Sequence, residues 1–235
     1  MSEFGDVPEG WPSADRYVVG AKGRVAEALD HPDAVSRLVR YYSLDGNYAG
    51  RTFLSLGPID PYSFTPGDLL AITTLSVEAP PAAIRRFLDE GTTRNHLNGL
   101  LSEHVLPLDS NLAVASAELL QAMENLYAEV KPALSKSGSN RKNRWVTASK
   151  LCARKRPDLF PVRDSVVCNF LGLTSANNYQ VDWQVFRQLI QSTDVTTRVD
   201  ELVDAAAKVP GVDVGHPNNR LRHLDVLLWM HATAG

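Results

Sequence analysis

Apolar residues recur at helical spacing along most of the chain. Segments that begin near Ala14, Val35 and Val114 carry apolar side chains three and four residues apart, which is typical of amphipathic helices. The His-Pro-Asp sequence at 31–33 ends the first of these segments. Regular apolar–polar alternation is confined to residues 51–56, where we expect a short extended piece. The pattern predicts an all-α protein of about ten helices.

Local chemistry places several helix starts. Thr65, followed by Pro66 and Asp68, offers a capping hydroxyl, a first-turn proline and an acid near the positive end of the helix dipole. The apolar run that follows predicts a buried central helix. Another helix is expected from Pro81 to the glycine at position 91, and Asp182 is expected to cap a later one.

Length and composition limit the class of protein. A chain of 235 residues suits one large domain or two small lobes, and 44% hydrophobic with 22% charged residues is typical of a globular protein. Glycines and prolines in residues 1–13 predict a flexible N-terminus, and residues 14–235 are expected to form a single all-α domain. No signal pattern or membrane-spanning apolar run is found, so we expect a cytoplasmic protein.

The two cysteines and the histidines give no sign of a metal site. Cys152 and Cys168 each lie in an apolar helical context, which favours small buried side chains over a disulfide or a reactive thiol. The sequence contains no CxxC, no HExxH and no His/Asp cluster at ligand spacing. We therefore expect neither a metal nor another cofactor.

Charge changes this picture in one region. Between positions 136 and 163 the chain has nine basic residues and one acid, Asp158, although the whole protein carries a net charge of −3. The basic residues are Lys136, Arg141, Lys142, Arg144, Lys150, Arg154, Lys155, Arg156 and Arg163. Asp164 follows at once, at the start of an expected helix. A solvated basic face is the usual fate of such a run. A helix over 145–155 entered by a basic loop is also a favourable phosphate site.

The order of motifs in this region resembles the helix-hairpin-helix DNA glycosylase superfamily. Val146-Thr147-Ala148 begins a helix, Pro161-Val162-Arg163-Asp164 forms a loop, and Leu171-Gly172-Leu173 follows. In that superfamily a hairpin holds the DNA backbone, the next helix begins with a catalytic residue before Thr-Ala, and the following loop delivers an aspartate. The resemblance implies two helical lobes with a DNA-facing centre at 136–173. The whole chain is also similar to an uncharacterised bacterial family.

The chain departs from the superfamily pattern at two points. The hairpin reads Lys142-Asn143-Arg144 where the superfamily has glycines that let the backbone approach phosphate. Val146 stands where bifunctional members carry a lysine that forms a Schiff base. The resemblance therefore implies a monofunctional glycosylase, with Lys150, one turn further on, as the candidate substitute for that lysine.

The resemblance implies a role for each part of the region. Asp164 would stabilise positive charge on the sugar, with Lys150 as a second catalytic candidate. The residues expected to hold DNA phosphates are Arg141, Lys142, Asn143, Arg144, Thr147, Arg154 and Arg163. The residues expected to line a base pocket are Tyr48, Phe53, Asp60, Tyr62 and Trp145. The partner would be double-stranded DNA with a damaged or modified base, including hypermodified phage DNA in a defence role, and the enzyme would act as a monomer and leave an abasic site.

Other readings of the same residues stay open. The aromatic side chains of the irregular segment 43–64 suit a pocket and equally suit a core sealed beneath a loop. Asp164 suits an ordinary helix cap, in which case the basic stretch would belong to a non-catalytic DNA- or RNA-binding module. A protein-interaction role or an unrelated helical role is the third alternative.

Overall fold

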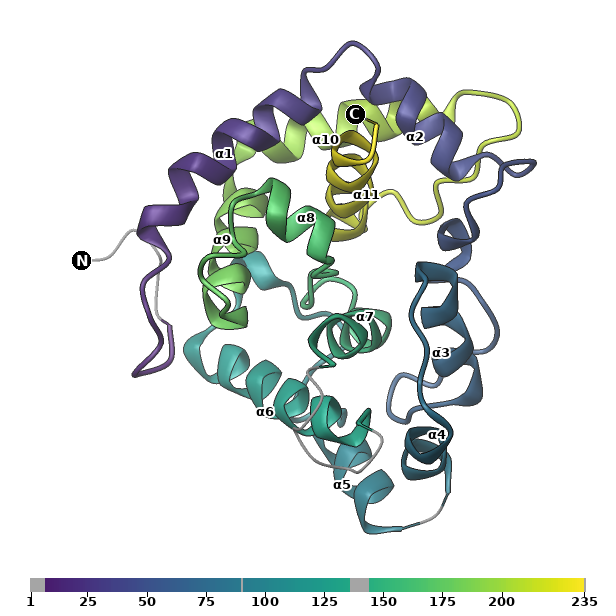
Figure 1. Cartoon of the computed structure of the whole chain (residues 1–235), viewed down its shortest axis with the longest axis vertical. Coiled ribbons are helices and arrows are strands. Elements are labelled where there is room, and N and C mark those ends of the chain that lie inside the picture. The colour runs from purple at the N-terminus through teal and green to yellow at the C-terminus, as the bar shows by residue number, and fades with distance from the viewer. Residues whose placement is uncertain (1–6, 90, 136–143, 235) are drawn as a thin grey trace. The chain divides into compact units, whose positions relative to one another are not determined.

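The computed structural model (Figure 1) describes residues 7–89, 91–135 and 144–234. These residues form eleven α-helices and three 3-10 helices, with one isolated bridge, between Ser43 and Val212, and no strand. The expected all-α fold is confirmed. The extended piece expected at 51–56 is wrong, because these residues form the end of a 3-10 helix and a turn in which the N–H of Leu56 donates to the carbonyl of Thr52 (2.8 Å).

The chain divides into two compact units. The first consists mainly of Glu9–Arg51 and Pro161–Gly235, and the second consists mainly of Thr52–Phe160. The chain therefore leaves the first unit after Arg51, builds most of the second unit from one continuous segment, and then returns.

The first unit is built around its last helix. Its elements are α1 (Asp15–Leu29), α2 (Ala34–Tyr42), η1 (Ala49–Thr52), α8 (Ser165–Phe170), α9 (Tyr179–Gln191), α10 (Thr193–Ala207) and α11 (Arg220–Ala232). Helix α11 contacts α2, α8 and α10, and every residue from Leu221 to Leu228 is buried. A helix enclosed on all sides needs partners for its polar residues, and Arg222 and Asp225 meet this need by forming an ion pair (2.5 Å).

The second unit places α7 at its centre. Its elements are α3 (Pro66–Ala71), η2 (Ile72–Leu75), α4 (Pro81–Leu88), α5 (Thr92–Leu100), η3 (Leu112–Val114), α6 (Ala117–Ala133) and α7 (Trp145–Lys155). Helix α7 contacts α6, α3 and η2, and all its residues from Thr147 to Lys155 are buried. Small side chains such as Ala148 and Ala153 let the neighbouring elements pack closely against it.

Capping chemistry decides where two helices begin. The hydroxyl of Thr65 accepts from the N–H of Asp68 (3.2 Å), and the Asp68 carboxylate accepts from the N–H of Thr65 (2.9 Å), so α3 begins with the expected cap. The cap expected at Asp182 is wrong. Helix α9 begins earlier, because the side chain of Asn178 accepts from the N–H of Gln180 (2.8 Å).

Trp11 and Pro12 of the N-terminal segment contact α9. The rings of Trp11 and Trp183 lie 6.0 Å apart, and the Gln184 side chain donates to the carbonyl of Pro12 (2.9 Å). Two residues of the segment expected to be flexible, 11 and 12, therefore pack against a helix. No helix in the described ranges is both long and apolar enough to cross a membrane.

Candidate functional site

The end of helix α7 carries three consecutive basic side chains, and all three are buried. Arg154, Lys155 and Arg156 are 2–3% exposed. Burying a charge is costly unless it is paired and hydrogen-bonded, so the partners of these groups decide what the basic run does.

One carboxylate, that of Asp68 on α3, faces two of the cations. The Nε of Arg154 lies 3.2 Å from Asp68 Oδ1, and the Nζ of Lys155 lies 2.8 Å from Asp68 Oδ2. All three side chains are fully enclosed. Asp68 thus caps its own helix and also receives charge-assisted hydrogen bonds from α7.

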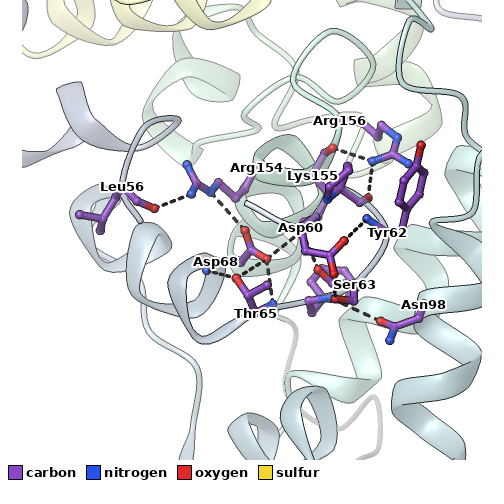
Figure 2. Close-up of polar contacts among 12 residues, drawn as sticks. Leu56, Asp60, Tyr62, Ser63, Thr65, Asp68, Asn98, Arg154, Lys155 and Arg156 are labelled. Carbon is purple, nitrogen blue, oxygen red and sulfur yellow. Dashed lines mark hydrogen bonds and ion pairs between the residues drawn. The ribbon is translucent and has the colours of Figure 1, made fainter. Parts of the chain in front are cut away.

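The remaining donors of the cations go to backbone carbonyls. Figure 2 shows Arg154 pointing toward Asp68 and the carbonyl of Leu56, to which its Nη2 donates (2.6 Å). The other carbonyl acceptors, all within the same unit, are Phe53 for Arg154, Asp60 and Ser63 for Lys155, and Pro61, Leu101, Leu106 and Lys155 for Arg156. Three cations are therefore balanced by one carboxylate and a shell of carbonyl dipoles.

Burial shifts the pKa values of these three cations. Desolvation lowers the pKa of Lys155 and of Arg154, and the Asp68 charge opposes this shift in both. Desolvation also lowers the pKa of Arg156. Nearby carboxylates oppose these shifts, with Asp60 adding to Asp68 at Lys155 and Glu103 acting at Arg156, so the direction indicates that the cost of burial outweighs them.

This arrangement changes the roles expected for two residues. Arg154 was expected to hold a DNA phosphate, but its guanidinium is enclosed and donates to Asp68, Phe53 and Leu56. Lys150 was expected as a second catalytic group, but it is 4% exposed and its Nζ donates to the carbonyl of Leu75 (2.8 Å). Both side chains hold the second unit together, and neither supports its expected role.

Asp164 belongs to the first unit and begins helix α8. Its Oδ1 accepts from the N–H of Val166 (2.9 Å), and the residue is half-buried. The preceding Pro161, Val162 and Arg163 are buried, so the carboxylate stands at the end of a fixed loop. The expected position of an aspartate at a loop-to-helix junction is thus found.

Arg163 differs from its expected role as a phosphate ligand. Its guanidinium is 5% exposed and donates twice to the Asp182 carboxylate, from Nε (2.8 Å) and from Nη2. Desolvation raises the pKa of Asp182, and the charge of Arg163 opposes the shift. The pair anchors the Asp164 loop to α9 and leaves Arg163 enclosed.

The other expected DNA contacts lie at or before the start of α7. Arg141, Lys142 and Asn143 fall outside the described residues. Arg144 is the N-cap residue of α7 and is half-buried, while Thr147 is 5% exposed. Of the expected phosphate ligands that the structure describes, Arg144 is the most exposed.

The residues expected in a base pocket are divided between the units. Tyr48 lies in the first unit and stacks on Tyr41, with ring centroids 5.3 Å apart. Phe53 in the second unit is buried, so the reading of this side chain as part of the core holds.

Asp60, Tyr62 and Trp145 are also in the second unit. The Asp60 carboxylate accepts from the N–H of Tyr62 (2.9 Å), and the Tyr62 hydroxyl donates to Glu103 (3.1 Å). Trp145 is half-buried at the start of α7. Asp60 and Tyr62 are exposed and neighbour one another, but the five expected residues do not form one pocket in either unit.

Two features escaped the sequence reading. Asp68 was recognised as a helix start but not as the partner of α7, and the only signal was a carboxylate in an otherwise apolar helix. The second is a polar cluster in which Arg222 donates to Tyr41 and His223 lies 3.0 Å from the Tyr42 hydroxyl. Nothing in the sequence indicated that Tyr41 and Tyr42 contact residues 222 and 223, 181 positions away along the chain.

The two cysteines are free thiols. Cys152 and Cys168 are buried and not bonded to each other, and burial raises the pKa of the Cys168 thiol to about 12. Across the described residues, no three His, Cys, Asp or Glu side chains gather as a metal site would require.

The comparisons with known proteins identify a family and no activity. Neither the curated proteins nor the solved structures include a match to this chain. One protein-family model, described as a family of unknown function (DUF6308), matches residues 34–232. The match spans α2 to α11. It gives no link to the helix-hairpin-helix glycosylases, so membership of that superfamily stays a prediction. The chain belongs to the DUF6308 family.

Proposed function

We propose that this protein is a monofunctional DNA glycosylase with Asp164 as its catalytic carboxylate. The observation that carries the proposal is the position of Asp164, which is half-buried, fixed by the Val166 N–H and placed at the end of a buried loop anchored by Arg163 and Asp182. A carboxylate held in this way does not need to reorganise as charge develops beside it.

The chemistry requires little more than such a carboxylate. The enzyme extrudes the modified nucleotide from the duplex, at a cost of a few kcal/mol. The N-glycosidic bond then breaks with its electron pair leaving on the base, and positive charge develops on the sugar. The Asp164 carboxylate stabilises that charge and accepts a proton from the water that attacks C1′. The products are the released base and an abasic site.

The phosphate contacts of the proposal rest on fewer residues than the sequence alone suggested. Arg154 and Arg163 are enclosed, so the contacts near α7 are assigned to Arg144 and to the basic residues 141 and 142 that precede it in the chain. The proposed partner is double-stranded DNA with a damaged or hypermodified base. The proposed setting is a monomeric enzyme in the cytoplasm, in repair or in defence against phage.

An excision assay tests the proposal. Purified protein is incubated with duplexes that contain modified bases, including heavily modified phage DNA, and the products are treated with alkali to cut abasic sites. We expect strand breaks with the wild type and a loss of at least about a hundredfold in Asp164→Asn. Asparagine can accept the same capping bond from Val166, so the fold should persist.

The control is Asp33→Asn, which makes the same change at the N-cap of α2, where the side chain forms no capping bond. This variant should keep full activity. Equal activity of Asp164→Asn and the wild type would contradict the assignment of Asp164.

A non-catalytic nucleic-acid-binding module is the second candidate, because the bond from Val166 already gives Asp164 a complete role as a helix cap. In that case no substrate in the panel would be cut, while DNA binding would persist and weaken steeply with salt. Binding with weak salt dependence would instead favour a protein-interaction role.

A further inference from the structure

Residues at the end of α4 and the start of α5 in the second unit line an open basic concavity. Its volume is about 480 Å³, and the residues that line it include Arg85, Arg86, Arg94, Thr92, Thr93 and Asp89. Its described lining thus holds three arginines and one carboxylate. This excess of positive charge lies well away in the sequence from the basic run of 136–163.

The three arginines are held to different degrees. Arg85 forms an exposed pair with Asp89 (2.9 Å). The Nη1 of Arg86 donates to the carbonyls of Ala133 (2.6 Å) and Ser135 (2.7 Å). Arg94 differs, since its buried Nε has no hydrogen-bond partner among the described residues. Its guanidinium adds a third positive charge to the lining of the concavity, and such an excess of one sign attracts an anion.

The start of α5 adds neutral donors to the same place. Its N-cap residue, Gly91, has no side chain to cap the first turn, and Thr92 and Thr93 are exposed. The first N–H groups of a helix lack partners within the helix and attract anions. The threonine hydroxyls can donate as well.

We propose that this concavity binds a phosphodiester group of a nucleic-acid backbone through Arg94, Arg86 and the two threonines. Guanidinium groups match the oxygen spacing of a phosphate, and the hydroxyls and N–H groups complete its shell. The cations at the end of α7 donate to internal acceptors, so this concavity supplies phosphate contacts that the end of α7 cannot. The choice of nucleic acid as the ligand rests on the proposed function.

Binding of a fluorescein-labelled duplex, measured by anisotropy over a range of salt concentrations, tests the site. We expect Arg94→Gln to bind about tenfold more weakly and to reduce the slope of log K against log salt by about 1, because one phosphate contact is lost. Arg40→Gln is the matched control. It removes the same charge from an exposed position in the first unit and should leave affinity and slope close to those of the wild type.

A second variant guards against misfolding. Thr93→Glu places a carboxylate in the concavity, and an acid in the first turn of a helix is compatible with the helix. We expect this variant to keep its thermal unfolding midpoint and to bind the duplex at least tenfold more weakly than the wild type. Wild-type affinity in both variants would overturn the site.

Inorganic phosphate separates the two sources of the anion. If millimolar phosphate raises the unfolding temperature of the wild type but not of Arg94→Gln, while duplex binding is the same for both, the site takes a free phosphate and the backbone assignment is overturned.

The base-excision assay, run at saturating enzyme, keeps this inference distinct from the proposed function. If the wild type excises bases and Arg94→Gln binds the duplex as tightly as the wild type, the phosphate site is ruled out and the proposed function stands. If Arg94→Gln binds more weakly but the wild type excises no base, the glycosylase activity is ruled out and the site stands. A wild type that does not bind DNA overturns both.

Discussion

Asp68 holds two buried cations through charge and hydrogen bonds together. The carboxylate faces Arg154 and Lys155 from within 3.2 Å, and no part of it reaches solvent. Removing one partner of a buried ion pair leaves an uncompensated charge in a poorly solvated place. Asparagine at this position would keep the size and one acceptor, but it would lose the charge and would place an NH2 donor where the second carboxylate oxygen accepts.

We therefore expect Asp68→Asn to reduce the free energy of unfolding by about 3–5 kcal/mol, as measured by urea denaturation. Asp89→Asn is the matched control, because it breaks an exposed pair with Arg85 and should cost less than about 1 kcal/mol. Equal losses in the two variants would show that the buried charge carries no special weight.

His223 is a second residue whose charge state is set by burial. It is 1% exposed, and its ring nitrogens lie 3.0 Å from the Tyr42 hydroxyl and 3.1 Å from the His216 carbonyl. Burial lowers the pKa of His223 from its ordinary value of 6.5 to about 4, the bond to His216 opposes this shift, and Arg222 adds to it. The neutral ring satisfies both contacts, since one nitrogen accepts and the other donates.

The lowered pKa of His223 makes the protein less stable as the pH falls. Between pH 4 and 6.5 the unfolded chain binds a proton at this residue and the folded protein does not, so stability is complete above pH 6.5 and is lost as the pH falls toward 4. The loss from this group should be about 3 kcal/mol. Urea denaturation of the wild type at pH 7 and pH 4.5 should show it, and His223→Gln should flatten the dependence. His96→Gln, at an exposed position, should not.

At the scale of the element, helix α7 shows what a sequence can and cannot predict. Its bounds, Trp145–Lys155, are those expected from its helix formers and from the proline at 157. The environment expected for its basic side chains was wrong, because Lys and Arg at helical spacing usually face solvent. The acceptors of Arg154 and Lys155 lie 86 to 101 positions away along the chain, and most are carbonyls, which leave no trace in side-chain chemistry.

This reading of α7 predicts a local effect of Lys155→Met. The variant keeps the length of the side chain and removes the donor to Asp60, Ser63 and Asp68. We expect hydrogen exchange of backbone amides in residues 57–63 to accelerate by at least about tenfold, since charge-assisted bonds stabilise the closed loop.

Lys131→Met, at a half-buried position on α6, is the control and should leave exchange in the loop unchanged. Uniform acceleration over the whole second unit would point to global destabilisation instead.

At the scale of the molecule, the sequence predicted the class and most helices, while the candidate site was predicted only in part. Asp164 lies at the loop-to-helix junction where it was expected, because capping and proline signals are local. The base pocket could not be predicted, since Tyr48 and Phe53 are close in sequence and belong to different units. A boundary at residue 51 follows from long-range packing, which has no local signal.

The family match begins at residue 34, yet α1 precedes it and belongs to the core of the first unit. Val18, Val25 and Leu29 are buried, and α1 contacts α9, α10 and α11. We expect deletion of residues 1–30 to cost about 5 kcal/mol or more, because these apolar side chains are lost and their partners become exposed. Urea denaturation of the full chain and of the truncated chain measures this effect.

The way α7 grips the segment from Phe53 to Ser63 has a consequence for divergence. The cations bind main-chain oxygens, which every amino acid provides, so these contacts do not depend on which side chains the segment carries. Exposed positions such as Ile59 and Tyr62 are therefore open to substitution while the backbone stays in place. Evolution could change the surface chemistry of this loop at little cost in stability, and a designer could use it as a graft site for foreign sequence.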